Sequence, residues 1–561
     1  MRAPGRQLRY VHEKNQLVIS SEQPLPADQD LAVTVYYQGR PNGPGRDFDS
    51  FIFSTHGSGV SRAPVVWSLS QPYGASDWFP CKDTPGDKAD SSYMALTVPD
   101  PLVGVSNGTL VRVDTNDAAR TRTYHWRHRY PIAQYLISVA ISNYARYDTP
   151  YVSNGQTLPI PNYVYPESFT ANMANLDLTP VLMRQFSEQF GPYPFAREKY
   201  GHAQFNWGGG MEHQTISSMG SFDGGLVAHE LAHQWFGNKV TCRSWEHIWL
   251  NEGFATYSEY LYRQRQTSAG EAARWLAQTA ASARGTGRRL VLTNTASIDS
   301  IFEYNLSYAK GAMVLHMLRG LVGDDTFFRT LRAYLTAPSL AYGTAVTDDF
   351  VALAEQVSGQ SLTYFFQPWL YGRGYPFYDV TVTRETDPRT VELTLRQTNR
   401  WDASTFFRMP IPIRLTTMER DTFITILNDQ PRQTFRLTAA RPVLSVAFDP
   451  NNQVLQAHTI NTLPPLVEPP VILSASDPAA ALRVYPNPTQ NTLTVHFETK
   501  TAGNSTISLT TVLGQQLITR TERLSPGDHR QQFPVSNVAP GKYILTVQSP
   551  DGRWSTSVFI Q

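Results

Sequence analysis

Residues 224–260 read GGLVAHELAHQWFGNKVTCRSWEHIWLNEGFATYSEY and contain the pattern that decides the fold and the chemistry. His229 and His233 are four residues apart in an apolar segment, a spacing that places both imidazoles on one face of a helix. Glu252 follows His233 after 18 intervening residues and can supply the third protein ligand that a catalytic zinc site requires. We therefore predict one zinc ion per chain, held by these three side chains.

Glu230 directly follows the first histidine and is not needed as a metal ligand. On the same turn of the helix it can take the proton of an activated water and pass it to a leaving amine. We predict that Glu230 is the catalytic base. Because a five-residue pattern also arises by chance, a solvated glutamate beside two structural histidines is the alternative. The spaced Glu252 and the two motifs below disfavour that alternative.

Two further motifs accompany this pattern, Gly209-Gly210-Met211-Glu212-His213 and Tyr308-Ala309-Lys310-Gly311. Together with HELAHQWFGN and WLNEGFATY, they resemble the zinc aminopeptidases of the aminopeptidase-N and leukotriene-A4-hydrolase type. These are gluzincins whose pattern is HExxH, 18 residues and then Glu. The stretch WFPCKDTPGDKA resembles their N-terminal β-domain, and the resemblance covers about residues 10 to 375.

The resemblance implies roles for three side chains around the metal. Tyr308 would donate a hydrogen bond to the oxyanion that forms on the substrate carbonyl, whereas from the residues alone it could equally be a packed core tyrosine. Glu212 would pair with the free α-ammonium of a peptide and fix which bond reaches the zinc. Counting back from WFPCKDTPGDKA places Gln71 beside the same ammonium.

The segment around Glu212 is also expected to bind the substrate backbone. Its glycines would let a peptide approach an exposed strand edge, and the alternative is a flexible turn. His213 stands where the family carries Asn. Its ring still offers a hydrogen-bond donor or acceptor, but it can also become charged near pH 6.5, which would weaken the attraction for an ammonium and with it strict aminopeptidase specificity. The predicted backbone-binding set is Gly209, Gly210, Met211 and His213.

Hydrophobic patterning predicts a multidomain α+β protein. Residues 1–147 are dominated by period-two strand patterns and predict a β-rich N-terminal domain, whereas residues 148–375 carry helical spacing. By resemblance, this second segment is a thermolysin-like, mostly helical catalytic domain. Period-two runs return in residues 376–460 and predict a β-sandwich domain. Residues 461–480 read as a Pro-rich linker.

Residues 481–561 are predicted to form a small all-β module. LRVYPNPTQNTLTVHF, ISLTTVLGQQL and VAPGKYILTVQSPDGRWSTSVFIQ are short strands separated by Pro- and Gly-bearing turns. They resemble the type A C-terminal sorting domain of the type IX secretion system of Bacteroidota, and a generic immunoglobulin-like module is the alternative. The resemblance implies a protein that is secreted or attached to the surface of a Gram-negative bacterium, with the type IX machinery as a partner.

Composition narrows the classes of partner further. Lys and Arg number 48 against 47 Asp and Glu, so the total charge gives no footprint for nucleic acid. No apolar run is long enough for a membrane span. The segment before Gln16 contains no apolar signal region and lacks the first strands of the family's β-domain, so we expect the chain to begin late in its natural reading frame. Cys81 and Cys242 are expected to be free thiols.

Three functions remain open from the sequence. The first is a secreted zinc aminopeptidase that removes N-terminal residues from peptides. The second is an endopeptidase or an epoxide-hydrolase-like activity on the same centre. The third is a non-catalytic surface binding protein, which is disfavoured because the ligands, the base and the tyrosine are all present. No long helical array follows Gly374, so we expect an open cleft that admits longer peptides or protein tails.

Overall fold

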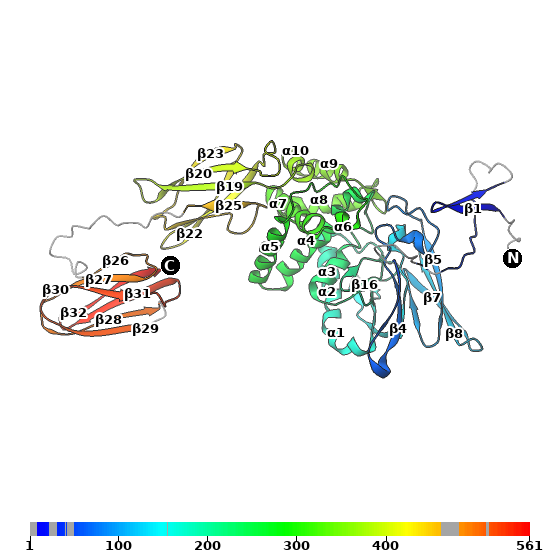
Figure 1. The fold of residues 1–561 in the computed structure, drawn as a ribbon, viewed down its shortest axis with the longest axis horizontal. Helices are drawn as coiled ribbons and strands as arrows, with labels where there is room; N and C mark the ends of the chain where they lie inside the picture. The colour runs from blue at the N-terminus through cyan, green and yellow to red at the C-terminus, as the bar shows by residue number, and fades with distance from the viewer. Residues whose placement is uncertain are drawn as a thin grey trace.

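A computed structural model describes residues 8–21, 31–39, 41, 50–153, 155–461, 482–511 and 515–561. The predicted Pro-rich linker lies outside these residues except for Asn461. Figure 1 shows β-strands near the N-terminus, helices in the middle of the chain and two further groups of strands toward the C-terminus. The predicted fold class, a multidomain α+β protein with a β-rich start, a helical middle and all-β C-terminal parts, is confirmed.

The N-terminal part consists of antiparallel strands. A four-stranded sheet has the order β3-β4-β9-β6, a three-stranded sheet has the order β5-β8-β7, and β1 and β2 form a separate hairpin. Trp67, Tyr124 and Trp126 are buried in the core beneath these sheets. The strands are β1 (Arg9–Glu13), β2 (Gln16–Ser20), β3 (Phe51–His56), β4 (Ala63–Ser68), β5 (Ser92–Pro99), β6 (Val103–Val105), β7 (Thr109–Asn116), β8 (Thr121–His128) and β9 (Ala140–Ser142).

A five-stranded sheet follows where the sequence patterns indicated helices. Its order is β10-β13-β14-β16-β15, with β13, β14 and β16 parallel and β15 antiparallel at the edge. The members β14 and β16 are only three residues long and fully buried, so they show no alternation of apolar and polar residues. The strands of this sheet are β10 (Ala145–Asp148), β13 (Pro161–Val164), β14 (His202–Gln204), β15 (Gly210–Met211) and β16 (Ser217–Met219), and β11 (Tyr151–Ser153) and β12 (Gln156–Leu158) form a separate hairpin.

Helices cover this sheet and form the middle of the molecule (Figure 1). They are α1 (Phe169–Leu176), α2 (Leu178–Phe190), α3 (Gly224–Ala232), α4 (Trp249–Gln266), α5 (Ala269–Ala283), α6 (Ile298–Ile301), α7 (Gly311–Val322), α8 (Asp324–Thr336), α9 (Thr347–Ser358) and α10 (Thr363–Phe366). Two π-helical segments, η6 (Tyr304–Lys310) and η7 (Gln367–Tyr371), precede α7 and follow α10. A short parallel pair, β17 (Thr241–Cys242) and β18 (Thr344–Ala345), ties two connections together.

Capping side chains set the start of two helices that matter for the site. The carboxylate of Asp223 accepts hydrogen bonds from the backbone N–H groups of Gly225 and Leu226, which begins α3. Ser268 and Glu271 form a reciprocal capping box at the start of α5. Both helices therefore begin at fixed positions beside the end of α4.

Two all-β units complete the chain. The first packs the sheet β23-β20-β19-β25 against the sheet β22-β21-β24, with apolar side chains alternating inward along each strand. The second has the sheets β26-β27-β30 and β29-β28-β31-β32. The strands are β19 (Phe377–Arg384), β20 (Thr390–Thr398), β21 (Met409–Thr416), β22 (Asp421–Asn428), β23 (Arg432–Thr438), β24 (Ser445–Phe448), β25 (Ala457–Ile460), β26 (Leu482–Tyr485), β27 (Thr492–Thr499), β28 (Gly503–Thr511), β29 (Gln516–Leu524), β30 (Gly527–Pro534), β31 (Gly541–Ser549) and β32 (Gly552–Ile560).

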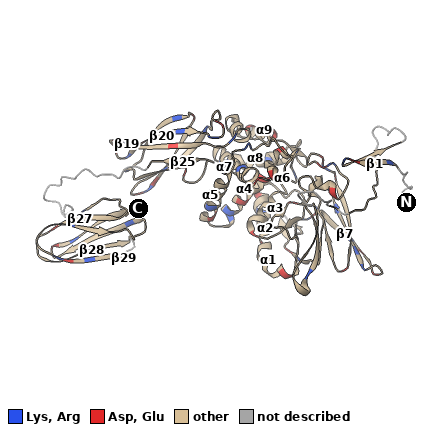
Figure 2. Cartoon of the chain, in the orientation of Figure 1, with Lys and Arg blue, Asp and Glu red and all other residues tan. Residues whose placement is uncertain are grey.

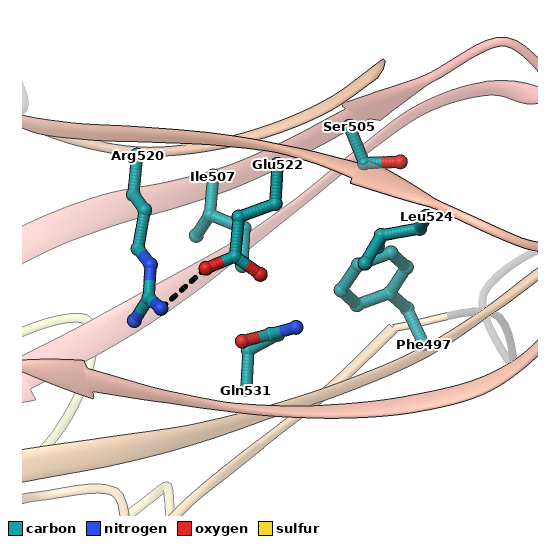
Figure 3. Close-up of a pocket in the computed structure, with 7 residues that line it drawn as sticks. All are labelled: Phe497, Ser505, Ile507, Arg520, Glu522, Leu524 and Gln531. Carbon is teal, nitrogen blue, oxygen red and sulfur yellow. Dashed lines mark hydrogen bonds and ion pairs between the residues drawn. The ribbon is translucent and has the colours of Figure 1, made fainter. Parts of the chain in front are cut away.

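Figure 3 shows a small cavity between the two sheets of the last unit, bordered by Phe497, Ile507 and Leu524 and by the ion pair of Arg520 with Glu522. Its volume of about 10 Å³ is close to the minimum for one water molecule. The cavity is therefore too small for an organic ligand.

Both acidic and basic residues are scattered along the helices and strands that the structure describes (Figure 2). Within the described residues, no helix is both long and apolar enough to cross a membrane. Cys81 and Cys242 are free thiols, as expected from the sequence.

Candidate active site and metal centre

The structure brings His229, His233 and Glu252 together. His229 lies in the last turn of α3, His233 caps that helix, and Glu252 lies in the first turn of α4. Glu252 Oε2 is 3.4 Å from His229 Nε2 and 3.3 Å from His233 Nε2, and the three donor atoms lie within 4.8 Å of one another. Across the described part of the chain, no other group of three His, Cys, Asp or Glu side chains converges in this way.

The second nitrogen of each histidine is held on the far side of its ring. His229 Nδ1 lies 3.2 Å from Glu259 Oε1, and His233 Nδ1 lies 3.0 Å from the carbonyl oxygen of Phe236. Both partners are hydrogen-bond acceptors, so Nδ1 must donate in each contact. Each Nε2 lone pair is therefore free to bind a metal ion.

The charges around the two imidazoles favour a cation. Burial acts to lower the pKa of His229, but hydrogen bonds to Glu252 and Glu259 outweigh it and raise that pKa well above its usual value. Burial also acts to lower the pKa of His233, but the negative charges of Glu252 and Glu212 outweigh burial and raise that pKa. Two imidazoles and one carboxylate are also a common donor set of catalytic zinc. The residues present therefore fit a zinc ion.

Glu230 points at the same centre from α3. Its side chain is 3% exposed, and its Oε2 has no hydrogen-bond partner among the described residues. Burial raises the pKa of Glu230 to about 8, against the lowering effect of the two histidines. Raising the pKa makes the carboxylate form a stronger base, and a bound metal cation would favour that ionised form, so Glu230 with one oxygen free can serve as a proton acceptor.

Gln71 and Glu212 form a second buried pair beside the metal centre. Gln71 follows β4 and donates a hydrogen bond from Nε2 to Glu212 Oε1 at 3.1 Å, although the two residues are 141 positions apart. Burial raises the pKa of Glu212, and the histidine charges act in the opposite direction. The predicted neighbourhood of Gln71, Glu212 and the metal centre is thus present in the fold.

The backbone around Glu212 is fixed by two residues that sequence reasoning did not single out. Asn238 Nδ2 donates to the carbonyl oxygen of Glu212 at 2.7 Å. Gln234 Nε2 lies 3.4 Å from the carbonyl oxygens of Glu212 and His213. Both residues belong to the run HELAHQWFGN, so the run that contains the predicted ligands His229 and His233 also holds the strand beside them. The sequence around Gln234 and Asn238 is largely apolar and did not indicate that these side chains hold the backbone of Glu212.

The other predicted substrate-binding residues lie on or next to the edge strand β15. Gly210 faces Glu230, because a Cβ at this position would lie 2.3 Å from Glu230 Oε1, whereas the side chain of Met211 is buried on the opposite face. Gly209 lies beneath the ring of Trp207, whose nearest atom would be 2.7 Å from an added Cβ. The strand can therefore present its backbone to a peptide, whereas the Met211 side chain cannot contact one.

The expected charging of His213 near pH 6.5 is wrong. The side chain is completely buried, and burial lowers its pKa to about 3. Its Nδ1 is 2.9 Å from Ser218 Oγ, and its Nε2 has no hydrogen-bond partner among the described residues. His213 is therefore neutral at physiological pH and does not repel an ammonium.

Tyr308 reaches the centre from the π-helical segment η6. Its ring stacks on that of His229 with 6.1 Å between centroids and on that of Tyr304 with 5.8 Å. Burial and the carboxylates of Glu252, Glu212 and Glu230 raise the pKa of its phenol well above the usual value. The hydroxyl is therefore protonated at neutral pH and can donate a hydrogen bond. Single-turn π-helical insertions of this kind are frequent at functional sites.

Glu259 is a further candidate site residue, in contact with His229, that the sequence analysis missed. It lies seven positions after Glu252 in α4, which is two helical turns, so both carboxylates are on one face. That spacing is a signal from which the residue could have been found. A carboxylate that holds Nδ1 of a ligand histidine fixes the ring orientation and raises the basicity of Nε2.

Fold and site together define a class of protein. A β-rich N-terminal domain and a helical domain with a buried His-His-Glu donor set have the architecture of M1-type metallopeptidases. Residues 5–136 match the Peptidase M1 N-terminal domain, residues 210–369 match the Peptidase family M1 domain, and residues 483–561 match the Secretion system C-terminal sorting domain. The chain therefore carries domains of the aminopeptidase-N-like peptidase family M1, joined to a type IX sorting domain.

Similar proteins are known from plants and animals. Aminopeptidase M1-A of Oryza sativa subsp. japonica is 28% identical over 394 residues, which are 66% of this chain and 43% of that protein. Aminopeptidase M1 of Arabidopsis thaliana is 30% identical over 353 residues, 58% of this chain and 39% of that protein. Glutamyl aminopeptidase of Homo sapiens is 27% identical over 399 residues, 66% of this chain and 40% of that protein. The chain spans about two fifths of the length of these relatives.

Among solved structures, the crystal structure of Legionella pneumophila aminopeptidase A in complex with aspartic acid is similar, with a TM-score of 0.62. The sequence identity is 19%, and the match covers 73% of this chain and 49% of that chain. This likeness shows a shared fold.

Proposed function

We propose that this chain is a zinc-dependent aminopeptidase that removes N-terminal residues from peptides. The observation that carries the proposal is the buried Gln71–Glu212 pair directly beside the His229, His233 and Glu252 donor set. A carboxylate at this position offers a partner for a free α-ammonium, and only the N-terminal residue of a peptide has one. An internal peptide bond has no charge there to pair with Glu212, so the pair favours removal of terminal residues over internal cleavage.

His229, His233 and Glu252 would hold the zinc ion, with Glu259 and the Phe236 carbonyl fixing the two imidazoles. When bound, zinc supplies a Lewis acid that polarises the substrate carbonyl and makes water a stronger acid. The protein side chains carry out the remaining steps.

Glu230 accepts the proton of the attacking water on its free Oε2 and returns it to the amine that leaves when the peptide bond breaks. Tyr308, protonated at neutral pH, donates a hydrogen bond to the oxygen on which negative charge develops. Glu212, supported by the Gln71 amide, holds the substrate ammonium, and the edge strand β15 aligns the backbone. Each group thus acts at a different atom of the substrate.

One decapeptide tests this function when it is offered with a free N-terminus and in acetylated form. Zinc-loaded wild-type protein should release residues stepwise from the free peptide only. Glu230→Gln should lower the rate by about 10³-fold while zinc content is kept, because proton transfer is lost. Glu212→Ala should lower kcat/KM by about 10²-fold through weaker ammonium binding. Exposed Glu246→Gln, outside the site, should behave as wild type.

The outcomes separate the alternatives. Equal cleavage of both peptides would make the protein an endopeptidase on the same centre. A zinc-loaded wild-type protein that cleaves neither peptide would favour a binding protein instead.

We propose further that the protein is exported. Residues 483–561 match a sorting domain, and recognition by the type IX machinery of a Gram-negative bacterium of the Bacteroidota would place the peptidase outside the outer membrane. The corresponding proposed domains are residues 1–147, 148–375, 376–460 and 481–561, with peptides as substrates. Expression in a type IX-competent host with and without residues 481–561 tests export, which should require this segment.

A further inference from the structure

A cleft of about 520 Å³ opens between the start of α3, the end of α4 and the first half of α5. Gly225, Arg263, Arg274 and Trp275 contribute to its walls. We propose that this cleft binds a carboxylate that the substrate carries about two residues beyond the cleaved bond, with Arg274 as its ion-pair partner. The proposal rests on the proposed aminopeptidase function and adds the class of peptide that the site prefers.

The cleft lies on a line along α3 that passes through the metal centre. Gly225 stands one helical turn before His229, and His233 stands one turn after it. Beyond the end of the helix, Asn238 holds the backbone of Glu212. The order along this line is therefore cleft, metal ligands and ammonium anchor. A peptide whose N-terminus pairs with Glu212 and whose first carbonyl reaches the metal continues toward Gly225.

The reach along this line can be stated in residues. Four residues of α-helix advance about 6 Å, and an extended peptide advances about 3.3 Å per residue. The distance from His229 to Gly225 therefore corresponds to about two residues of extended substrate. The cleft is in a position to receive the third residue of the peptide.

Two side chains in contact, Arg263 and Glu259, connect the cleft to the proposed metal ligand His229. A Cβ on Gly225 would lie 2.6 Å from Arg263 Nη2, so the arginine lies directly over this glycine. Arg263 Nη1 donates to Glu259 Oε2 at 3.3 Å, and Glu259 Oε1 contacts His229 Nδ1. The wall of the cleft and the wall of the metal site are thus formed by the same two residues, Arg263 and Glu259.

The charges of the cleft leave one cation available. The carboxylate of Asp223 is engaged by the backbone N–H groups that start α3, and that of Glu271 by Ser268 at the start of α5. Arg263 is engaged by Glu259. Arg274, by contrast, is exposed, and among the described residues its guanidinium interacts only through space, with the carboxylate of Glu271 one turn earlier on α5. An incoming carboxylate could therefore form a direct ion pair with Arg274, in competition only with this through-space attraction to Glu271.

One further feature favours an anion over a cation. The guanidinium of Arg263 is fixed over the rings of Trp275 and Tyr262, at 5.3 and 5.5 Å from their centroids. Its positive edge therefore stays in the cleft wall. Figure 2 shows basic residues on α5 and the end of α4.

Two pairs of short peptides test the proposal and distinguish the source of the carboxylate. The first pair has Glu or Gln as an amidated third residue, and the second has Ala as third residue with a free or amidated C-terminus. At low salt, wild-type kcat/KM should be about three- to fivefold higher for the carboxylate member of a pair, as expected for an exposed ion pair. The preference should fall as salt is raised. An amino-acid nitroanilide, which ends before the cleft, is the reference substrate.

Arg274→Gln should remove the preference and leave nitroanilide hydrolysis unchanged, whereas Arg274→Lys should retain part of the preference. Arg265→Gln is the matched control, because Arg265 is an exposed α4 arginine paired with Glu188 outside the cleft. Retention of the full preference in Arg274→Gln, or an equal loss on all peptides, would overturn the proposal.

The proposal and the proposed function fail in different ways. If zinc-loaded wild-type protein does not hydrolyse the nitroanilide, the proposed aminopeptidase function is contradicted, but the carboxylate site is not. Calorimetry on the zinc-loaded Glu230→Gln variant measures the affinity for the same peptides without turnover. The same measurement on the double variant Glu230→Gln, Arg274→Gln shows whether Arg274 contributes to carboxylate binding. Equal affinities for the two members of both pairs would overturn the carboxylate site.

Discussion

Gly253 and Gly311 face each other so closely that a Cβ on Gly311 would lie 2.8 Å from the Cα of Gly253, and a Cβ on Gly253 2.9 Å from the Cα of Gly311. Gly253 directly follows Glu252 in α4, and Gly311 begins α7 directly after the π-helical segment that carries Tyr308. The contact of two backbones without side chains therefore sets how near Tyr308 comes to the metal ligands. It explains physically why both motifs contain glycine.

Gly311→Ala should separate these helices. The added methyl group meets backbone atoms that cannot rotate away, and overpacking of this kind costs about 1–3 kcal/mol. We expect a lower unfolding free energy and a lower kcat, with zinc retained, because Tyr308 moves away from the substrate oxygen. Denaturant unfolding and steady-state kinetics measure the two effects. Gly270→Ala is the control, because the nearest atom there is 4.0 Å away, and it should be neutral or stabilising. Equal behaviour of the two variants would contradict the argument.

Glu259→Gln should weaken zinc binding without removing a ligand. The amide can still accept the His229 hydrogen bond, but it loses the negative charge that raises the basicity of the opposite ring nitrogen. Replacement of such a supporting group typically costs about 10- to 100-fold in metal affinity. Competition with a zinc chelator of known affinity measures the change. Glu188→Gln removes an exposed carboxylate paired with Arg265 and should leave zinc affinity unchanged. An unaltered affinity in Glu259→Gln would show that the charge has no effect on the metal.

Gly210→Ala should displace the proposed base. An alanine methyl group would lie 2.3 Å from Glu230 Oε1, so the carboxylate has to move from the position that the metal centre requires. We expect kcat to fall by about 10-fold or more, because proton transfer depends strongly on geometry, while zinc content stays the same. Gly208→Ala, where no atom lies within 4 Å of the added Cβ, is the matched control. A fall in KM alone, with kcat unchanged, would argue that Glu230 is not the group affected.

The convergence of the two candidate histidines could be predicted from sequence because local periodicity fixes their geometry. Residues four apart in a helix share a face, so His229 and His233 had to converge, and the same rule applied along α4 would have found Glu259. Tyr308 required the resemblance to a family. Without that resemblance Tyr308 could not be assigned to the site, because it lies in a π-helical segment that no periodic sequence pattern indicates.

The rest of the site depends on contacts that no local pattern records. Gln71 meets Glu212 across 141 positions, and Asn238 reaches the same residue from a turn after α3. The sheet containing β15 was missed because its central strands are short and buried on both faces, which removes the alternation that identifies a strand. The charge state of His213 was misjudged because burial, which sequence alone does not reveal, decides its pKa.

That buried histidine predicts how stability depends on pH. The pKa of His213 is about 3 in the folded protein and about 6.5 in an unfolded chain. Between these values the unfolded state binds more protons, so the free energy of unfolding rises with pH up to about 6.5 and falls as the pH is lowered. His213→Asn removes this contribution. The slope of the unfolding free energy against pH, between about pH 4 and 5.5, should decrease by about 1.4 kcal/mol per pH unit.

Urea unfolding followed by tryptophan fluorescence, in the presence of a chelator so that metal release does not contribute, measures this slope. His12→Asn is the control, because His12 is exposed on β1. The same neutrality predicts that His213→Asn leaves the pH dependence of kcat/KM unchanged between about pH 5.5 and 8, since the ring does not titrate there. A shifted activity profile together with an unchanged stability slope would mean that His213 carries a proton in the folded enzyme.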